Sequence, residues 1–213
     1  MISPRNVTME WPQLLVRAFM EHKNHTADKG QSAAAAAPAL DYKRFDVKAL
    51  EGRLLKASGP AQCCAELAKA FGVRDNEVAL LRLERGLLRF LFPVELTAAG
   101  SIPISSSSAV AAHTAVTRKV ELFNNFTIVK HANIFETIKP SGENGEQLQP
   151  ATIHKLMSAP VVDKAEKVLG VIQICHKGFD LASAGPDFTL DDLQNLELAA
   201  KALAPVKFMS ENF

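Results

Sequence analysis

Two long strand-like runs in the C-terminal part of the chain constrain the fold more than any other feature of the sequence. Ile153–Val162 and Val168–His176 are rich in β-branched and apolar residues, and the charged turn Asp163–Glu166 joins them. Two such runs with so short a connection predict an antiparallel hairpin. We therefore expect a sheet built around this hairpin, with the rest of the chain covering it.

A second hairpin signal lies earlier in the chain. Val78–Glu84 and Leu87–Phe92 are apolar, partly alternating runs separated by Arg85-Gly86. Ser101–Ile104 adds a short strand to the predicted sheet. The following stretch, Arg118–Pro150, has no regular pattern and is predicted to be a loop or irregular crossover, long enough to invite a functional interpretation.

Helical patterns flank the predicted strands. Apolar residues recur at helical spacing from Phe45 to Leu55, Ser58–Pro60 interrupts the pattern, and a second helix ends near Gly72. A closing helix is predicted from Leu193, Leu196, Ala200 and Leu203, at steps of three and four residues. Helices before and after a mainly antiparallel sheet predict an α+β fold.

The predicted domain occupies residues 41–206, between an N-terminal extension of residues 1–40 and a tail of residues 207–213. Gln31–Leu40 is an alanine-rich linker. Before it, Trp11–Phe19 has the spacing of a short amphipathic helix that could dock on the domain or on a partner. The alternative is an extension without a function.

Charge and composition exclude several classes of function. With 24 Lys+Arg against 23 Asp+Glu, the formal net charge is +1, which argues against nucleic acid and against an anionic membrane as partners. The longest apolar stretch, Ala33–Leu40, is too short to span a membrane, and the N-terminus lacks a signal sequence. Cys63, Cys64 and Cys175 form neither a disulfide framework nor a zinc spacing. These features predict a cytoplasmic protein with no metal site.

Two motifs near the C-terminus are similar to those of a known family. Val168–Lys177, with its Gly-Val followed by an apolar run and Lys, resembles the last long strand of GAF domains, which are small-molecule sensor modules of signalling proteins. Cyclic-nucleotide-binding members carry Asn-Lys, a gap, Phe, three residues and Asp-Glu. Lys177, Phe188 and Asp192 fit this signature, whereas His176 and Leu193 replace Asn and Glu and argue against a cyclic nucleotide.

The second motif also has a purely structural explanation. Thr189 as N-cap with Asp192 three residues later forms an acidic variant of the capping box, and Phe188 can pack on Leu193 as a hydrophobic staple. Helix initiation therefore accounts for these residues without a ligand.

The resemblance implies an architecture and a place for a ligand. The expected sheet has five to six strands, with the N- and C-terminal helices on one face and a helix and loop as a cap on the other. The ligand of the family lies between the sheet and this cap. The resemblance further implies a sensory or regulatory domain, which we expect to act as a homodimer through its terminal helices and to signal through a protein partner.

The cap contains the first candidate ligand site. The serine run Ser105–Ser108 is predicted to provide the N-cap of a small-residue helix at about Ala109–Thr117. The unpaired N–H groups there could bind a carboxylate, phosphate or carbonyl oxygen through Ser107, Ser108 and Ala109. Alternatively, the serines only cap the helix.

The remaining candidates combine amides with an aromatic ring. Phe123, Asn124 and Asn125 lie where GAF domains often carry a polar residue near the pocket, and they offer an aromatic face beside amide groups. Phe123 and Phe126 could equally fill the space of a ligand. Gln173 lies within an apolar strand, where a buried amide requires a hydrogen-bond partner from the protein or a ligand.

Other candidate groups have simpler interpretations. Arg89 could be a charge of the pocket, although its place in Leu87–Phe92 favours an exposed position. His113 or His131 could hold haem, and Cys63-Cys64 lies near a helix start where a thiolate could be activated. Some GAF relatives reduce free methionine sulfoxide with loop cysteines, which this chain lacks between Ser101 and Val171.

Three hypotheses thus remain open from the sequence. The first is a non-enzymatic GAF-type sensor for an unidentified small molecule, with its cofactor left unassigned. The second is a GAF-like scaffold whose pocket is filled by its own side chains. The third, more remote, is a haem or cysteine redox protein.

Overall fold

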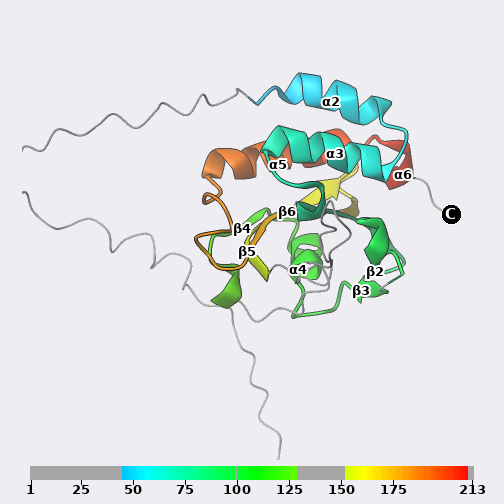
Figure 1. Cartoon of the computed structure of the whole chain (residues 1–213). Coiled ribbons are helices and arrows are strands. Elements are labelled where there is room, and N and C mark those ends of the chain that lie inside the picture. Colours follow the sequence, from blue (N-terminus) through cyan, green and yellow to red (C-terminus); the bar gives the residue numbers. More distant parts are fainter. Residues whose placement is uncertain (1–44, 99, 129–151, 211–213) are drawn as a thin grey trace, which may run out of the picture. The chain divides into compact units, whose positions relative to one another are not determined.

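The computed structural model describes residues 45–98, 100–128 and 152–210 (Figure 1). The predicted helix at Trp11–Phe19, the linker at Gln31–Leu40 and His131 lie outside the described residues. The described residues all belong to one compact unit. Among the described residues, no helix combines the length and the apolar character that a membrane span requires.

A six-stranded antiparallel sheet forms the centre of the domain, with the strand order β3-β2-β1-β6-β5-β4. The predicted hairpin of β5 and β6 is confirmed and lies beside β1, so the α+β fold with five to six strands is confirmed as well. The strands are β1 Val78–Glu84, β2 Leu87–Phe92, β3 Ser101–Pro103, β4 Glu121–Phe123, β5 Thr152–Val162 and β6 Val168–Gly178.

The two hairpin turns follow from their sequences. Arg85 and Gly86 both have positive φ, 49° and 79°, as the tight turn of a two-residue hairpin requires. In the β5–β6 turn, Asp163 Oδ1 accepts hydrogen bonds from the backbone N–H groups of Ala165 and Lys167 at 2.8 and 2.9 Å. The side chain of Asp163 thus replaces backbone partners and closes the turn.

In the part of the chain that the structure describes, four helices cover one face of the sheet, and their caps match the sequence signals. Asp46 caps the first helix, Gly72 ends the second in the left-handed conformation, and Thr189 with Asp192 forms the predicted capping box of the third. Figure 1 shows α2 outside α3 and α5, which lie next to the sheet. The helices are α2 Val47–Lys56, α3 Pro60–Phe71, α5 Leu190–Leu203 and α6 Lys207–Ser210.

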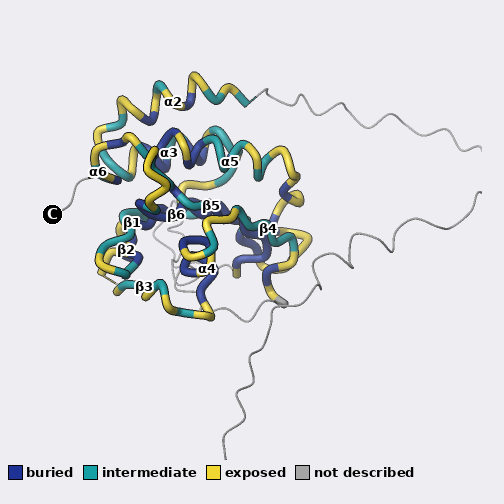
Figure 2. Tube along the Cα trace, turned by 180° about the vertical axis from the view of Figure 1, so that it is seen from behind, coloured by how far each residue is buried: buried dark blue, intermediate teal, exposed yellow. Residues whose placement is uncertain are grey.

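The opposite face of the sheet is covered by a shorter helix, α4 (Val110–Thr117), with two 3₁₀ turns, η2 (Val94–Leu96) and η3 (Phe126–Ile128). We call this face the cap side and the other the helix side. Each face has its own apolar core, because the side chains of every strand alternate between them. Figure 2 shows the buried residues gathered along the strands and the elements next to them.

Two details differ from the sequence-based expectations. The stretch Arg118–Pro150, predicted to be a loop, contains the edge strand β4, which pairs with Leu156–Ser158 of β5. Residues 207–210, placed in the predicted tail, form α6, and Met209 packs into the helix-side core with only 2% of its surface exposed. The packed part of the chain therefore extends beyond residue 206.

Candidate functional site

A row of hydrogen-bonded polar side chains crosses the cap side of the sheet beneath α4. Glu121 of β4 pairs with Ser158 of β5, which pairs with Gln173 of β6, so the three lie side by side across the strands. Thr114 of α4 reaches this row from above. We call these four residues the polar row. Thr114, Ser158 and Gln173 are all buried.

The hydrogen bonds connect the polar row without a gap. Gln173 Nε2 lies 3.3 Å from Ser158 Oγ, and Ser158 Oγ lies 2.7 Å from Thr114 Oγ1. Thr114 Oγ1 donates to Glu121 Oε2 at 2.5 Å. His113 Nδ1 lies 2.8 Å from the other carboxylate oxygen of Glu121. Together with His113, the polar row forms a hydrogen-bonded chain from the exposed imidazole at the surface to the buried residue Gln173.

Only one of the two polar atoms in the Gln173 side chain has a hydrogen-bond partner among the described residues. Its Nε2 bonds to Ser158, but among the described residues no donor reaches its Oε1. The neighbour of Gln173 on the other side is Ala79 of β1, whose methyl group supplies no hydrogen bond. The sequence predicted a hydrogen-bond partner for this amide. Among the described residues, the protein supplies one for Nε2 and none for Oε1.

His154 of β5 is a second incompletely paired group. It is 7% exposed, and neither ring nitrogen meets a hydrogen-bond partner in the described part of the chain. A bulge between Ile153 and Lys155 interrupts the pairing with β6 at this point. Ile153 and Leu156 on either side of the bulge both belong to the cap-side core.

The serine run does not act as predicted. The N-cap of α4 is Ala109, and no side chain caps this helix. Ser107 and Ser108 are exposed, with Ser108 Oγ 3.3 Å from Ser106 Oγ, whereas Ala109 is buried in the cap-side core. The prediction of serine caps is wrong because the serines form a surface turn before the helix.

Asn124 and Asn125 have structural partners. Asn124 Nδ2 donates to the carbonyl oxygen of Phe188, and the N–H of Phe188 donates to Asn124 Oδ1, both at 2.9 Å. This paired contact fixes the segment before α5 against the end of β4. Asn125 is exposed and accepts a hydrogen bond from Thr127 Oγ1.

Phe123 belongs to the packing of the cap side. It is half-buried and packs edge-on against the buried Phe126, with 5.9 Å between ring centroids. This contact agrees with the interpretation in which these rings fill space. Of the predicted site residues, the structure places Gln173 in the polar row. Phe123 lies beside the row, because it is two residues after Glu121 on β4 and therefore on the same face of the sheet.

Sequence reasoning missed Thr114, Glu121, Ser158 and His154. Gln173 stood out because its neighbours in the strand are apolar. Ser158 and His154 lie in an equally buried strand and carried the same signal. Thr114 and Glu121 could not be found in this way, because their place beside Ser158 depends on the docking of α4 and on the register of β4.

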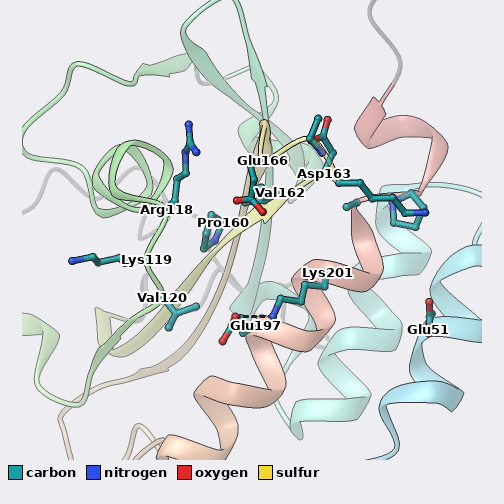
Figure 3. A pocket seen from close by; sticks show the side chains of 14 residues that line it. Glu51, Arg118, Lys119, Val120, Pro160, Val162, Asp163, Glu166, Glu197 and Lys201 are labelled. Carbon is teal, nitrogen blue, oxygen red and sulfur yellow. Dashed lines mark hydrogen bonds and ion pairs between the residues drawn. The ribbon is translucent and has the colours of Figure 1, made fainter.

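A broad, open groove of about 1290 Å³ lies at the other end of β5 (Figure 3). Pro160 and Val162 contribute apolar surface, and Arg118 lies near them at the end of α4. Glu197 and Lys201 of α5 pair with each other at 2.8 Å. The groove presents charges of both signs and none of the predicted site residues, so it does not single out one class of ligand.

The end of β6 is held by a buried carboxylate. Glu77, 3% exposed, accepts hydrogen bonds from the backbone N–H of Lys177 at 2.7 Å and from the backbone and guanidinium of Arg74 at 2.8 and 2.6 Å. The guanidinium of Arg74 also donates to the carbonyl oxygen of Lys177. Burial alone would raise the pKa of Glu77, but these hydrogen bonds outweigh it and leave the pKa below its ordinary value.

His176 gives the domain a pH dependence near neutrality. Its ring stacks on Phe188, with centroids 4.3 Å apart, and burial, aided by the charges of Lys155 and Arg74, lowers its pKa below 6.5, although Glu77 and Asp192 oppose this. A lowered pKa in the folded state adds stability that is present above pH 6.5 and is lost as the pH falls through the folded-state value. We expect the unfolding free energy to fall over this range in the wild type and to stay flatter in His176→Phe.

Urea unfolding at a series of pH values tests this expectation. His176→Phe preserves an aromatic ring against Phe188, so its packing matches the wild type. Equal pH slopes below pH 6.5 in the two proteins would contradict the assignment to His176.

The three cysteines are predicted to be unreactive in the folded protein. Cys63, Cys64 and Cys175 have no exposed surface. Burial and the nearby Glu66 raise the pKa of Cys63 to about 11, and burial with Cys63 and Asp75 raises the pKa of Cys64 further. Because the thiolate is the reactive form, we expect Ellman's reagent to label no thiol until a denaturant is added. Fast labelling of any thiol in the native protein would refute this.

The described residues show no arrangement of three or more His, Cys, Asp or Glu side chains that could hold a metal ion. His113, considered for haem, bonds through Nδ1 to Glu121. One nitrogen of its imidazole is thus engaged by Glu121 of the polar row.

Comparison with known structures finds the same fold in proteins of very different sequence. The GAF domain of an Acinetobacter phosphoenolpyruvate-protein phosphotransferase matches with a TM-score of 0.55 and 13% identity, covering 78% of this chain and 95% of that one. The GAF domain of a Coxiella burnetii phosphoenolpyruvate-protein phosphotransferase gives 0.52 and 10%, covering 74% and 88%. Free methionine-R-sulfoxide reductase from Neisseria meningitidis gives 0.52 and 15%, covering 77% and 87%.

Sequence comparison points to the same family. No curated protein matches the chain. The model of the GAF domain family matches residues 61–205, which reach from the first turn of α3 to just beyond the end of α5. The chain therefore belongs to the GAF domain family.

Proposed function

We propose that this protein is a sensory or regulatory GAF domain that binds a small polar molecule on the cap side of its sheet, beside α4. One observation carries the proposal: at the end of the polar row, Gln173 Oε1 meets no described donor and is not a fully buried atom. An accessible acceptor of this kind can take a hydrogen bond from a ligand. His154 of β5 is a second buried polar group, whose ring nitrogens meet no partner among the described residues.

A scaffold role is the second candidate, favoured by the packing next to α4. Ala111, Ala112 and Ala115 let this helix lie close to the sheet, and Phe126 is buried in the same core. In that case Gln173 remains partly unpaired and the cap side binds nothing. Enzymatic redox chemistry is a weaker candidate, because it requires an accessible thiolate and the three cysteines are buried.

Native mass spectrometry of the full chain tests the proposal. We expect a reproducible non-covalent extra mass on the wild type that is lost in Gln173→Leu, a change of similar volume that removes both polar atoms. Lys201→Ala, in the groove of Figure 3, is the matched control and should retain the mass. Loss of the mass in the control but not in Gln173→Leu would move the site to the groove. Bare protein in all three cases would favour the scaffold.

A homodimer through the terminal helices and a protein partner for signal output complete the proposal. The outer surface of α2 is mainly polar, with Leu55 as an exposed apolar residue at 52%. The same native spectra report the oligomeric state. A monomer at all concentrations would contradict the dimer.

A further inference from the structure

The residues that follow β6 fold back against the end of this strand. We call residues 179–188 the strap; it lies between the end of β6 and Thr189, the N-cap of α5. The strap touches the strand closely, because a Cβ atom added at Gly178 would lie 2.7 Å from the nitrogen of Ala184. Within the strap, the backbone N–H of Ala184 donates to the carbonyl oxygen of Asp180 at 3.1 Å. The strap is therefore a compact turn packed on β6.

Side chains from two other parts of the domain hold the strap in place. Lys155 of β5 is only 4% exposed; its ammonium donates to the carbonyl oxygen of Gly185 and pairs with Asp187 at 2.8 Å. At the end of the strap, the backbone of Phe188 exchanges two hydrogen bonds with the side chain of Asn124, both at 2.9 Å. Opening the strap breaks these contacts and releases the segment that leads into α5.

His176 of β6 is the imidazole that the strap covers. Its ring stacks on Phe188, with centroids 4.3 Å apart and planes 7° from parallel. Gly185 lies against the same ring, since a Cβ atom added there would be 3.6 Å from Nδ1. Neither ring nitrogen makes a hydrogen bond to a described residue. The closed strap thus removes much of the ring from water without supplying a hydrogen bond, which favours the neutral imidazole over the charged one.

The charged groups around His176 act in both directions. Its cationic neighbours oppose a proton on the ring and its carboxylate neighbours favour one, but burial has the largest effect and keeps the pKa of His176 below its ordinary 6.5. Opening the strap returns the ring to water, so the open strap binds a proton more readily than the closed one. The charged neighbours are Lys155 of β5, Arg74 and Glu77 at η1 (Asp75–Glu77), Asp192 of α5 and, through its pair with Lys155, Asp187 of the strap.

We propose that the strap is a pH-sensitive switch, closed while His176 is neutral and opened when its imidazole binds a proton. Acid then releases the start of α5 together with the side chain of Asn124, which follows β4 directly. The equilibrium constant for opening rises as the pH falls below 6.5 and levels off below the pKa of the closed state. Such a switch needs no ligand, so it goes beyond the proposed function and does not fail with it.

Hydrogen exchange of the full chain, followed by mass spectrometry between about pH 7.5 and about pH 5.5, tests the switch; histidine is the side chain that ordinarily titrates in this range. The reporters are the amides of Ala184 and Phe188, which are hydrogen-bonded to Asp180 and Asn124. Dividing each rate by the intrinsic exchange rate at the same pH gives the opening constant. The buried residues 171–174 of β6 are the reference, because core strands exchange only when the domain unfolds.

We expect the strap to open at least about ten-fold more often than the reference, and its opening constant to rise by about three-fold or more across the range. The rise should disappear in His176→Phe and in His176→Leu, whose side chains bind no proton. The same rise in these variants would overturn the proposal. So would a strap that exchanges only as often as the reference, since His176 would then act through unfolding of the whole domain, or an opening constant of the wild type that does not change with pH.

Discussion

Gly170→Ala is expected to destabilise the domain by about 3 kcal/mol or more, at the upper end of overpacking effects. Gly170 lies in β6 opposite Arg82 of β1, within the run Val168–Lys177 that resembles the last strand of GAF domains. A Cβ atom there would lie 2.0 Å from the carbonyl oxygen of Leu81 and 2.8 Å from the terminal carbon of Met209. The backbone of β1 would have to move, so the central pairing of the sheet would be disturbed.

Gly52→Ala is the matched control for this substitution. Gly52 lies inside α2, and no heavy atom comes within 4 Å of the added Cβ. We expect it to stabilise the protein by about 0.5–1 kcal/mol, since alanine favours a helix interior over glycine. Urea unfolding followed by circular dichroism measures both variants. A loss below about 1 kcal/mol in Gly170→Ala would show that β1 and β6 can separate without strain.

Glu77→Ala is expected to destabilise the folded state by about 3 kcal/mol. The substitution leaves the backbone N–H of Lys177 without its acceptor and deprives Arg74 of its ion pair at 2.6 Å. Glu77→Gln keeps the size of the side chain and one acceptor, so its loss should be smaller. Glu51→Ala, at an exposed position of α2, is the control and should change stability little.

The effect of the Glu77→Ala substitution on the unfolding free energy is also expected to depend on pH in the acid range. The pKa of Glu77 in the folded state is below its ordinary 4.5, so its contribution is fully present above pH 4.5 and is lost as the pH falls through the folded-state value. The difference in unfolding free energy between wild type and Glu77→Ala should therefore shrink below pH 4.5. A constant difference through that range would argue that Glu77 acts through packing rather than through its charge.

An element could be predicted from the sequence when it was long enough to show a hydrophobic period. β5, β6 and the helices α2, α3 and α5 have enough residues for a period to show, and their positions were predicted from it, whereas the four-residue α6 was not predicted. β4 has three residues and is defined by pairing with Leu156–Ser158, more than thirty positions along the chain. No local pattern could reveal it. The same reason explains why Glu121, which lies on β4, was missed.

The candidate site shows the same division between local and long-range information. Gln173 was found because a lone amide in an apolar strand is unusual within its own sequence. Asn124 was predicted to face a ligand, but its amide is used by the backbone of Phe188, 64 positions away. Tertiary contacts decide whether a side-chain amide is hydrogen-bonded by the protein or left unpaired. These contacts cannot be read from the composition of a loop.

A crystal structure of the full chain, purified under native conditions together with the molecule found by mass spectrometry, tests the central claim most directly. The account predicts a small molecule on the cap side beside α4, with a polar atom within hydrogen-bond distance of the Gln173 side-chain amide. A molecule bound in the groove next to Arg118 and Lys201, or a cap side closed entirely by the protein's own side chains, would contradict it.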